Sequence, residues 1–147
     1  MRPLTWCVFA LLLCSACSTP EEQPTSTPVT EPVLESREGL ASYVASLLDG
    51  RTTASGVPFD TNALVAAHPT YPFGTIVRVT NLTNNRTVEV RVVDRGPASN
   101  ARDQGVIIDL SKAAATVLAF IEEGRAKVRT EVLRWGQPDG ADQLGSR

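Results

Sequence analysis

The 147-residue chain is poor in several residue types that mark particular functions. It holds one histidine, one methionine and three cysteines, and only 5% of its residues are aromatic. Its 14 basic residues are balanced by 16 acidic ones, so the basic excess typical of nucleic-acid-binding proteins is missing, and we expect no nucleic-acid partner. The length fits one folded domain.

The sequence also lacks an apolar run long enough to span a bilayer as a helix, since Leu4–Leu13 is too short for that. Arg2 precedes this run and small residues follow it, which is the pattern of a secretory signal peptide. Cys17 completes a segment that resembles the lipobox of bacterial lipoproteins, whose cysteine is acylated. We therefore expect a signal peptide over residues 1–16 and a lipid anchor at Cys17. By the same resemblance, Ser18 after the cysteine implies sorting to the outer membrane of a Gram-negative cell, facing the periplasm.

Cys14 and Cys17 also form a C-x-x-C pair, so a redox or metal site is an alternative. A metal ion needs more ligands than two cysteines provide, and the one histidine, His68, is far away in sequence. Both cysteines lie in a segment that lipoprotein processing removes or acylates. The lipid anchor is therefore the favoured interpretation, and we expect no metal and no cofactor.

Composition divides the remaining chain into three parts. Residues 17–36 are rich in Pro, Thr, Ser and Glu and bury too little apolar surface to offset their conformational entropy, so we predict a disordered tether. Residues 37–135 form the predicted folded domain. Residues 136–147 are polar and are predicted to be a flexible tail.

Inside the domain the apolar residues mostly alternate, which is typical of half-buried strands. Val88, Val90 and Val92 are predicted to face inward, and the turn residues 81–86 join their strand to a strand over 75–80 as a hairpin. Asn81 and Asn85 head N-x-T sequons but are interpreted as turn residues. Further strands are predicted over residues 40–46, 105–108 and 127–133.

One helix is signalled by Ser111 as N-cap and by Gly124 as the C-terminal stop. Between them the apolar residues recur at helical spacing. A second short helical turn is predicted over residues 62–67, ending before Pro69. Several short strands with one or two small helices favour a closed barrel over an open sheet.

Three groups of motifs resemble the rare lipoprotein A family: Gly39–Tyr43 with Gly50–Gly56, Asn62–His68 with Pro72–Thr75, and Val93–Pro97 with Ile107–Ser111. Their order and approximate spacing agree over residues 39–133. The resemblance implies a mainly β fold, a six-stranded double-psi β-barrel with one or two short helices. It also implies an endolytic lytic transglycosylase that acts on peptidoglycan glycan strands, and we expect a monomer.

A lytic transglycosylase uses the sugar's own 6-hydroxyl as nucleophile, so one acid that later acts as base can suffice, and that acid needs a raised pKa. Asp94 is the candidate, because strict alternation gives it the inward parity of Val92 at a strand end. Arg95 would oppose protonation if its guanidinium reached the carboxylate. The alternative is an aspartate that caps backbone N–H groups in a Gly-Pro turn. The family motif favours the catalytic role.

The resemblance assigns a second catalytic position to His68, which would orient the acid and the sugar; in isolation a lone histidine is more often structural. Asp109, Arg95, Ser55 and Asp60 are predicted to bind substrate. For Asp109 the alternative is a charge favoured by the N-terminus of the following helix, which would lower its pKa.

The sequence departs from the family at Val57, where active members carry glutamate directly after the Ala-Ser-Gly motif. Valine neither donates a proton nor accepts a hydrogen bond, and Asp60 is a possible substitute. Three hypotheses follow: a transglycosylase that uses Asp94 with His68, a binding module that holds glycan strands without cutting them, and a structural lipoprotein with a protein partner. Val57 favours the second hypothesis, the motifs around Asp94 and His68 favour the first, and no feature supports the third.

Overall fold

The computed structural model describes residues 31–44 and 46–137. The predicted signal peptide, Cys17, most of the predicted tether and the tail residues 138–147 lie outside the described residues. Within the described ranges, no helix has the length and apolar character that crossing a bilayer would need.

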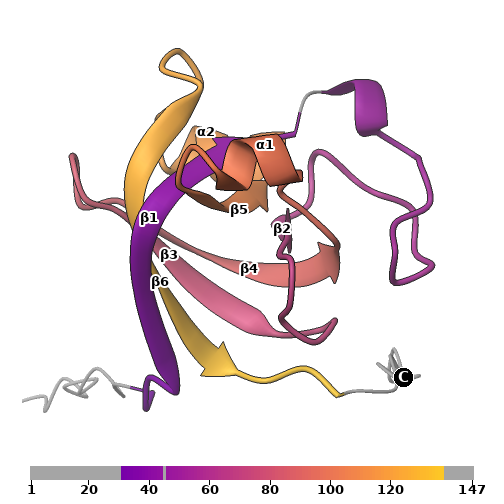
Figure 1. Ribbon diagram of the computed structural model, residues 1–147, viewed down its shortest axis with the longest axis horizontal. Coiled ribbons are helices and arrows are strands. Elements are labelled where there is room, and N and C mark those ends of the chain that lie inside the picture. Colours follow the sequence, from indigo (N-terminus) through magenta and orange to yellow (C-terminus); the bar gives the residue numbers. More distant parts are fainter. Residues whose placement is uncertain (1–30, 45, 138–147) are drawn as a thin grey trace, which may run out of the picture. The chain divides into compact units, whose positions relative to one another are not determined.

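Six strands close into a barrel in the order β1-β5-β2-β4-β3-β6 (Figure 1). β1 pairs with β5 and β2 with β4 in parallel, whereas the other four neighbouring pairs are antiparallel. The predicted mainly β, six-stranded barrel with short helices is confirmed. The strands are β1 (Glu35–Tyr43), β2 (Val65–Ala67), β3 (Ile76–Asn81), β4 (Thr87–Asp94), β5 (Val106–Leu110) and β6 (Arg125–Arg134).

The predicted hairpin is formed by β3 and β4, with Val79 opposite Val88 and Val77 opposite Val90. These four valines and Val92 are buried in the core, as their alternation predicted. The core continues through apolar residues of the other strands, among them Ala41, Ala66, Ile108, Leu110, Val128 and Val132. Asn81, the first of the two sequon residues, is buried and donates from Nδ2 to the Leu118 carbonyl at 3.0 Å.

Helix α2 (Lys112–Val117) begins where the sequence predicted but ends earlier. The Ser111 hydroxyl accepts from the N–H of Ala114 at 3.3 Å, which confirms the N-cap. The helix does not continue to Gly124, because Ala119 already has the left-handed φ of 54°. The carbonyl of Leu118 is satisfied by the side-chain amides of Asn81 and Asn84 from the β3–β4 turn, so the terminus is capped by another segment of the chain.

The helical turn predicted over residues 62–67 is wrong, because residues 65–67 form β2. Asp60 accepts the N–H of Asn62 at 2.8 Å, an Asx turn that directs the backbone away from a helix. Ala66 then pairs with Val92 on one side and with Leu110 on the other. Pairing on both edges outweighs the helical preference of a short Ala-rich segment.

Two other short helices have no counterpart in the sequence prediction. They are η1 (Ser46–Leu48), a single 3-10 turn, and α1 (Ser99–Arg102). The residue before α1, Ala98, makes no side-chain capping hydrogen bond, and none of the helix residues is buried. Neither an N-cap nor an apolar period therefore marked this helix in the sequence.

Strand β1 begins at Glu35, within the segment predicted as tether, and not at Leu40. Glu35 and Ser36 pair with Val132 and Glu131 of β6, so the strand starts where β6 is long enough to receive it. β1 and β6 run side by side along the barrel (Figure 1). The first residues of β1 are polar and mostly exposed, so their composition is the same as that of a disordered tether. For this reason the sequence did not indicate where the strand begins.

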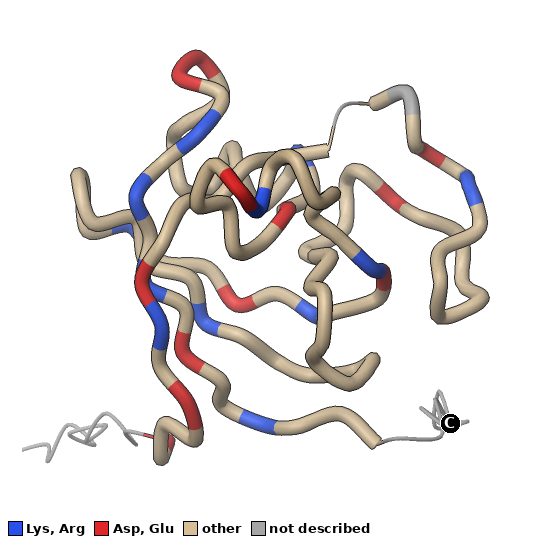
Figure 2. Tube along the Cα trace, in the orientation of Figure 1, with Lys and Arg blue, Asp and Glu red and all other residues tan. Residues whose placement is uncertain are grey.

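Charged residues of both signs are interspersed along the barrel trace (Figure 2). Arg78 and Glu89 form an ion pair at 3.2 Å across the hairpin, and Arg129 lies 4.0 Å from both Glu38 and Glu131. Exposed pairs of this kind contribute between zero and about 1 kcal/mol each. The stability of the barrel therefore comes mainly from its valine-rich interior.

Ile108→Ala should lower the free energy of unfolding by about 2–5 kcal/mol, because Ile108 is fully buried and truncation leaves a cavity in the core. Urea denaturation of the purified protein, followed by circular dichroism, measures the change. Val117→Ala is the control, since Val117 is exposed on α2, and its effect should stay within about 0.5 kcal/mol. Equal losses in the two variants would contradict the assigned core.

Candidate functional site

Two β-bulges bring the predicted acidic residues to one level of the barrel. Between β2 and β4 the register passes from Ala66–Val92 to Ala67–Asp94. Between β1 and β5 a similar shift leaves Asp109 opposite Ser42, and Ala67 pairs with Asp109 as well. Bulges redirect side chains and occur often beside active sites. Asp94, Ala67, Asp109 and Ser42 thus form one row across four adjacent strands.

The bulge changes the expected orientation of Asp94. Both Val92 and Val93 are buried, so strict alternation fails at the end of β4, and Asp94 is only half-buried. Its Oδ1 accepts the N–H groups of Ala54 at 2.9 Å and Arg95 at 2.8 Å. Asp94 therefore does accept backbone N–H groups, as the non-catalytic alternative proposed.

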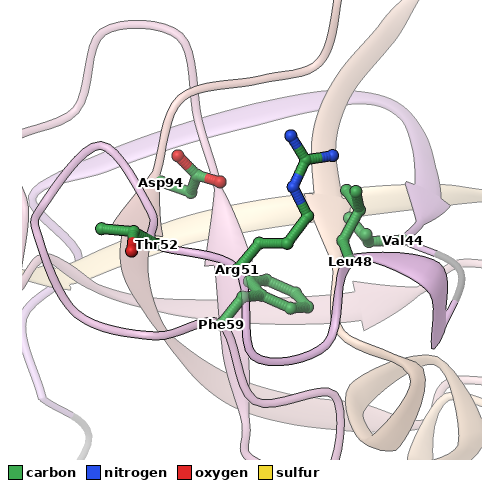
Figure 3. Close-up of a pocket in the computed structure, with 6 residues that line it drawn as sticks. All are labelled: Val44, Leu48, Arg51, Thr52, Phe59 and Asp94. Atoms are coloured by element: carbon green, nitrogen blue, oxygen red, sulfur yellow. The ribbon is translucent and has the colours of Figure 1, made fainter.

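The same aspartate also lines an open pocket (Figure 3). The remaining lining residues come from the end of β1, from η1 and from the segment that follows: Val44, Leu48, Arg51, Thr52 and Phe59. Among the described residues no hydrogen bond engages Oδ2 of Asp94. One carboxylate oxygen is thus held by the backbone while the other is available to a ligand.

The loop over residues 52–58 carries Val57 and is fixed at both ends. Thr52 and Pro58 form an isolated β-bridge, and Val57 O accepts from both the N–H and the hydroxyl of Thr53. Ser55 donates its N–H to Val93 O at 3.3 Å, which ties the loop to the end of β4. Val57 is 47% exposed, so its side chain makes little contact with the core. The position expected to hold glutamate therefore lies in a loop bound directly to the Asp94 segment.

The pKa of Asp109 is shifted in the direction opposite to the one that the N-terminus of the following helix would cause. Burial raises the pKa of Asp109, and the Ser42 hydroxyl, which donates to its Oδ1, and the charge of Arg125 offset only part of that shift. The expected lowering is wrong because the residue lies within β5, two residues before the N-cap Ser111. A Cβ on Gly96 would stand 3.2 Å from Asp109 Oδ2, so the glycine lets the chain after β4 pass close to this carboxyl.

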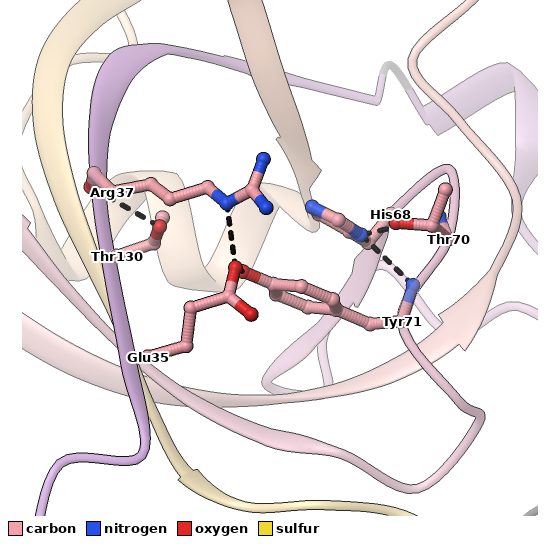
Figure 4. A network of polar contacts seen from close by, with 6 residues as sticks. All are labelled: Glu35, Arg37, His68, Thr70, Tyr71 and Thr130. Atoms are coloured by element: carbon pink, nitrogen blue, oxygen red, sulfur yellow. Dashed lines mark hydrogen bonds and ion pairs between the residues drawn. The ribbon is translucent and has the colours of Figure 1, made fainter.

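His68 is buried and holds a defined tautomer (Figure 4). Its Nδ1 accepts the N–H groups of Tyr71 at 3.0 Å and Thr70 at 3.3 Å. A nitrogen that accepts hydrogen bonds carries no proton, so the neutral ring keeps its proton on Nε2. Burial, reinforced by the positive charge of Arg37, lowers the pKa of His68 to about 4. The imidazole is therefore a neutral Nε2–H donor near pH 7.

Three residues around His68 were missed by the sequence reasoning. Tyr71 stacks on the imidazole with ring centroids 3.5 Å apart, and its hydroxyl donates to Glu35 Oε1 at 2.8 Å. The same oxygen accepts from Arg37 Nε at 2.5 Å. The hydrogen bond from Tyr71 lowers the pKa of Glu35, while burial raises the pKa of Tyr71. The available signal was the period-two spacing of Glu35 and Arg37 ahead of the predicted strand.

Arg95 supports the loop after β2 and does not reach the Asp94 carboxylate. Its Nη1 donates to the carbonyls of Tyr71 at 2.8 Å and His68 at 3.2 Å. Its guanidinium carbon lies 3.8 Å from the centroid of the Phe73 ring. The anticipated effect of Arg95 on protonation of Asp94 is therefore not supported by this geometry, and its role in substrate binding stays a prediction.

The two predicted catalytic residues, His68 and Asp94, are joined by a backbone hydrogen bond, in which His68 N–H donates to Asp94 O at 3.1 Å. Ser55 joins them through its loop, and its hydroxyl bonds that of Thr53 at 2.8 Å. Of the predicted site residues, Asp94 alone lines the pocket; His68, Asp109, Arg95, Ser55 and Asp60 do not. Asp60 is also exposed. The residues that the structure describes include no group of three His, Cys, Asp or Glu side chains placed to hold a metal ion.

A family model described as lytic transglycolase, a double-psi β-barrel family, matches residues 38–130. The chain belongs to this family. The resemblance to the rare lipoprotein A family is confirmed. The match covers all of β2 to β5 and most of β1 and β6.

Curated relatives agree with this membership. The protein named endolytic peptidoglycan transglycosylase RlpA of Campylobacter jejuni is 44% identical over 117 residues, which are 80% of this chain and 41% of the relative. Its namesake in Haemophilus influenzae is 48% identical over 97 residues, 66% of this chain and 32% of the relative. This chain thus spans less than half the length of these relatives.

Solved structures share the fold. The Streptomyces papain inhibitor has a TM-score of 0.55 and 27% identity, with 70% of this chain and 98% of that chain covered. An expansin of Clavibacter michiganensis has a TM-score of 0.53 and 22% identity, with 70% of this chain and 52% of that chain covered. The expansin likeness, at this identity, concerns the barrel alone.

The buried neutral His68 predicts a pH-dependent stability. The unfolded chain binds a proton at this residue below its ordinary pKa of 6.5, whereas the folded protein binds it only near 4. Protons therefore favour unfolding in that window, and the His68 contribution to stability is lost as the pH falls from about 6.5 to 4. Urea denaturation at several pH values measures it. In His68→Asn, whose Oδ1 can replace Nδ1 as acceptor, the loss over this window should be smaller; an unchanged pH profile would contradict the assignment.

Proposed function

We propose that the protein cleaves peptidoglycan glycan strands as an endolytic lytic transglycosylase, with Asp94 as the group that exchanges the proton. The observation that supports this most directly is the placement of Asp94, with one carboxylate oxygen fixed by two backbone N–H groups and the residue on the wall of an open pocket. Relatives of the family carry the name of this activity. Cell wall organisation is the corresponding process.

In the proposed reaction the bond between C1 of N-acetylmuramic acid and O4 of N-acetylglucosamine breaks without water. The protonated Asp94 gives its proton to O4 as that oxygen leaves. The 6-hydroxyl of the muramic acid then attacks C1 and transfers its own proton to the Asp94 carboxylate, which leaves a 1,6-anhydro end. The enzyme regains its proton in each cycle, so one carboxyl serves as acid and base, unlike the two-carboxylate hydrolases.

The other site residues have supporting roles in this proposal. His68 is a neutral Nε2–H donor, which suits it to orient the sugar without adding a positive charge beside the acid. Asp109 binds a sugar hydroxyl; its raised pKa favours a carboxyl that also donates a hydrogen bond. Ser55 and Arg95 are kept as substrate-binding candidates from the family motifs, and Asp60 is kept as a candidate because it could substitute for the missing glutamate.

A glycan-binding module that does not cut is the second candidate function, and Val57 is the observation that favours it. The loop that holds Val57 keeps its connections to Val93 and Asp94. The protein thus retains the shape of the site but lacks the carboxyl that the family motif places there. Binding depends on that shape, whereas cleavage depends on the missing group as well.

We also propose that the domain is held at the cell envelope by a lipid anchor at Cys17. The segment before the barrel supports this, since residues 17–34 have the composition of a tether and β1 begins at Glu35. A tether of this length would let a membrane-anchored barrel reach glycan strands in the periplasm, with the outer membrane as the favoured location.

Asp94→Asn should abolish cleavage and leave the barrel folded. The asparagine Oδ1 still accepts the N–H groups of Ala54 and Arg95, but the amide transfers no proton, so the rate should fall about a hundredfold or more. Purified protein is incubated with peptide-free glycan strands, and 1,6-anhydro-muramic products are quantified by mass spectrometry. Asp103→Asn, an exposed aspartate beside α1, is the matched control and should retain full activity. Undiminished cleavage by Asp94→Asn would reject this acid.

Val57→Glu should raise cleavage about tenfold or more if the missing carboxyl limits the rate. The substitution is accommodated because Val57 is 47% exposed. The same product assay measures the gain, and Leu64→Glu, which adds the same charge at another exposed aliphatic residue, controls for charge alone. If strands bind the wild-type protein but neither it nor Val57→Glu releases anhydro products, the binding module is the correct function.

A further inference from the structure

A second group of polar side chains surrounds the free ring nitrogen of His68, outside the pocket that Asp94 lines. Glu35 and Arg37 lie two residues apart on β1, so their side chains leave the same face of the strand. Together with His68 and Tyr71 from the segment after β2 they form what we call the His68 cluster (Figure 4). None of its members lines the pocket beside Asp94.

Contacts within the His68 cluster hold its side chains in place. Glu35 Oε1 accepts from the Tyr71 hydroxyl at 2.8 Å and from Arg37 Nε at 2.5 Å. The Tyr71 ring stacks on the imidazole, and the Thr130 hydroxyl donates to Arg37 O at 3.3 Å. Because these side chains are ordered before a ligand arrives, binding costs them little conformational entropy.

Three side chains of the cluster carry polar atoms without a partner among the described residues. These atoms are the two Nη of Arg37, Oε2 of Glu35 and Nε2 of His68. Among the described residues that are not exposed, Arg129 Nε is the one fully buried side-chain nitrogen or oxygen that lacks a partner, so Glu35 Oε2 and His68 Nε2 reach the surface.

The free donors lie close together. The Arg37 guanidinium and the free ring nitrogen of His68 point toward one another (Figure 4), and the positive charge of Arg37 lowers the pKa of His68, as expected of neighbouring groups. The neutral imidazole keeps its proton on Nε2, so it donates there as the guanidinium does. The cluster therefore presents hydrogen-bond donors from two residues beside the acceptor oxygen of Glu35.

We infer that the His68 cluster is a subsite for the acetamido group of an N-acetylated sugar. An acetamido group carries a carbonyl acceptor, an N–H donor and a methyl group. Its carbonyl oxygen suits the donors of Arg37 and His68, and its N–H suits Glu35 Oε2. A hydroxyl has one oxygen for both functions, so it spans the cluster less well. This inference rests on the proposed glycan substrate, but it concerns binding and does not require cleavage.

Charge and aromatic surface also match such a ligand. The charges of Glu35 and Arg37 cancel and His68 is neutral, so the cluster favours a neutral group over a carboxylate. Trp135 packs edge-on against Tyr71 with ring centroids 5.2 Å apart, and 39% of Trp135 is exposed. Its rigid indole offers apolar area on which the acetamido methyl or the face of a pyranose ring can pack.

The test compares tetra-N-acetylchitotetraose with cellotetraose, two β-1,4-linked sugars that differ in carrying an acetamido group or a hydroxyl at C2. Neither contains muramic acid, so the bond that the proposed reaction breaks is absent. In NMR titrations of the purified protein, the acetylated sugar should bind about tenfold more tightly, the size expected for a charge-assisted hydrogen bond. It should also shift the resonance of the His68 Nε2–H.

Arg37→Gln and Glu35→Gln should each bind the two sugars with similar affinity. In Glu35→Gln the amide oxygen still accepts from Tyr71 and Arg37, so the amide nitrogen replaces Oε2 and turns the acceptor into a donor. Arg78→Gln is the matched control, because it also removes an arginine from an ion pair with a glutamate, that with Glu89 at 3.2 Å, and it should keep the tenfold preference.

Equal binding of the two sugars by the wild-type protein, or a preference that survives in Arg37→Gln or Glu35→Gln, would overturn the inference. So would resonance shifts that fall on the pocket beside Asp94 and leave His68 and Tyr71 unchanged, an outcome that the wild-type protein alone reveals. The cleavage assay on peptide-free strands separates this result from the proposed function. Preference without cleavage would place the subsite in a binding module, and cleavage without preference would reject only the subsite.

Discussion

The short strand β2 is the element on which the site depends. Its three residues pair in parallel with β4 and antiparallel with β5, so they join the two strands that carry the acidic residues. Ala67 pairs with Asp94 on one side and with Asp109 on the other. A bulge on each side, at Val93 and at Ile107, then sets both carboxyls at the level of this alanine. The barrel supplies rigidity, and β2 determines which residues face one another.

The sequence predicts the parts of this fold that follow a simple period. Val88, Val90 and Val92 alternate and form a buried strand, and Ser111 has the chemistry of an N-cap and acts as one. β2 was misassigned because a segment with two alanines has helical propensity, and only its pairing on both edges makes it a strand. Such pairing is a property of the closed barrel, which no local window contains. The family motifs compensated for this, since the resemblance implied the barrel although residues 65–67 were assigned to a helical turn.

The candidate site likewise contains residues that the sequence predicted and residues that it did not. Asp94 and His68 were found from motifs, and their backbone hydrogen bond joins them in the structure. The bulges were not foreseeable from alternation, and for that reason the predicted inward parity of Asp94 was wrong. The predicted pKa direction of Asp109 was wrong because the residue is buried within β5. Glu35, Arg37 and Tyr71 were missed because their contacts join β1 to a loop more than thirty residues away. Long-range polar contacts of this kind leave no pattern in a single sequence.

The arginines around the site differ in the groups that their charges contact. Arg95 is committed to backbone carbonyls and Arg37 to Glu35, so neither neutralises Asp94. His68 is kept neutral by burial and by backbone donors to Nδ1. Arg51 alone among these groups has its charge free within the described residues, and it lies in the pocket that Asp94 lines. The glycan binding proposed for this site depends on the shape of the pocket, and the loop that holds Val57 keeps its connections to Val93 and Asp94 without a carboxyl at that position. The proposed proton transfer depends on a single carboxyl, that of Asp94 at the end of β4.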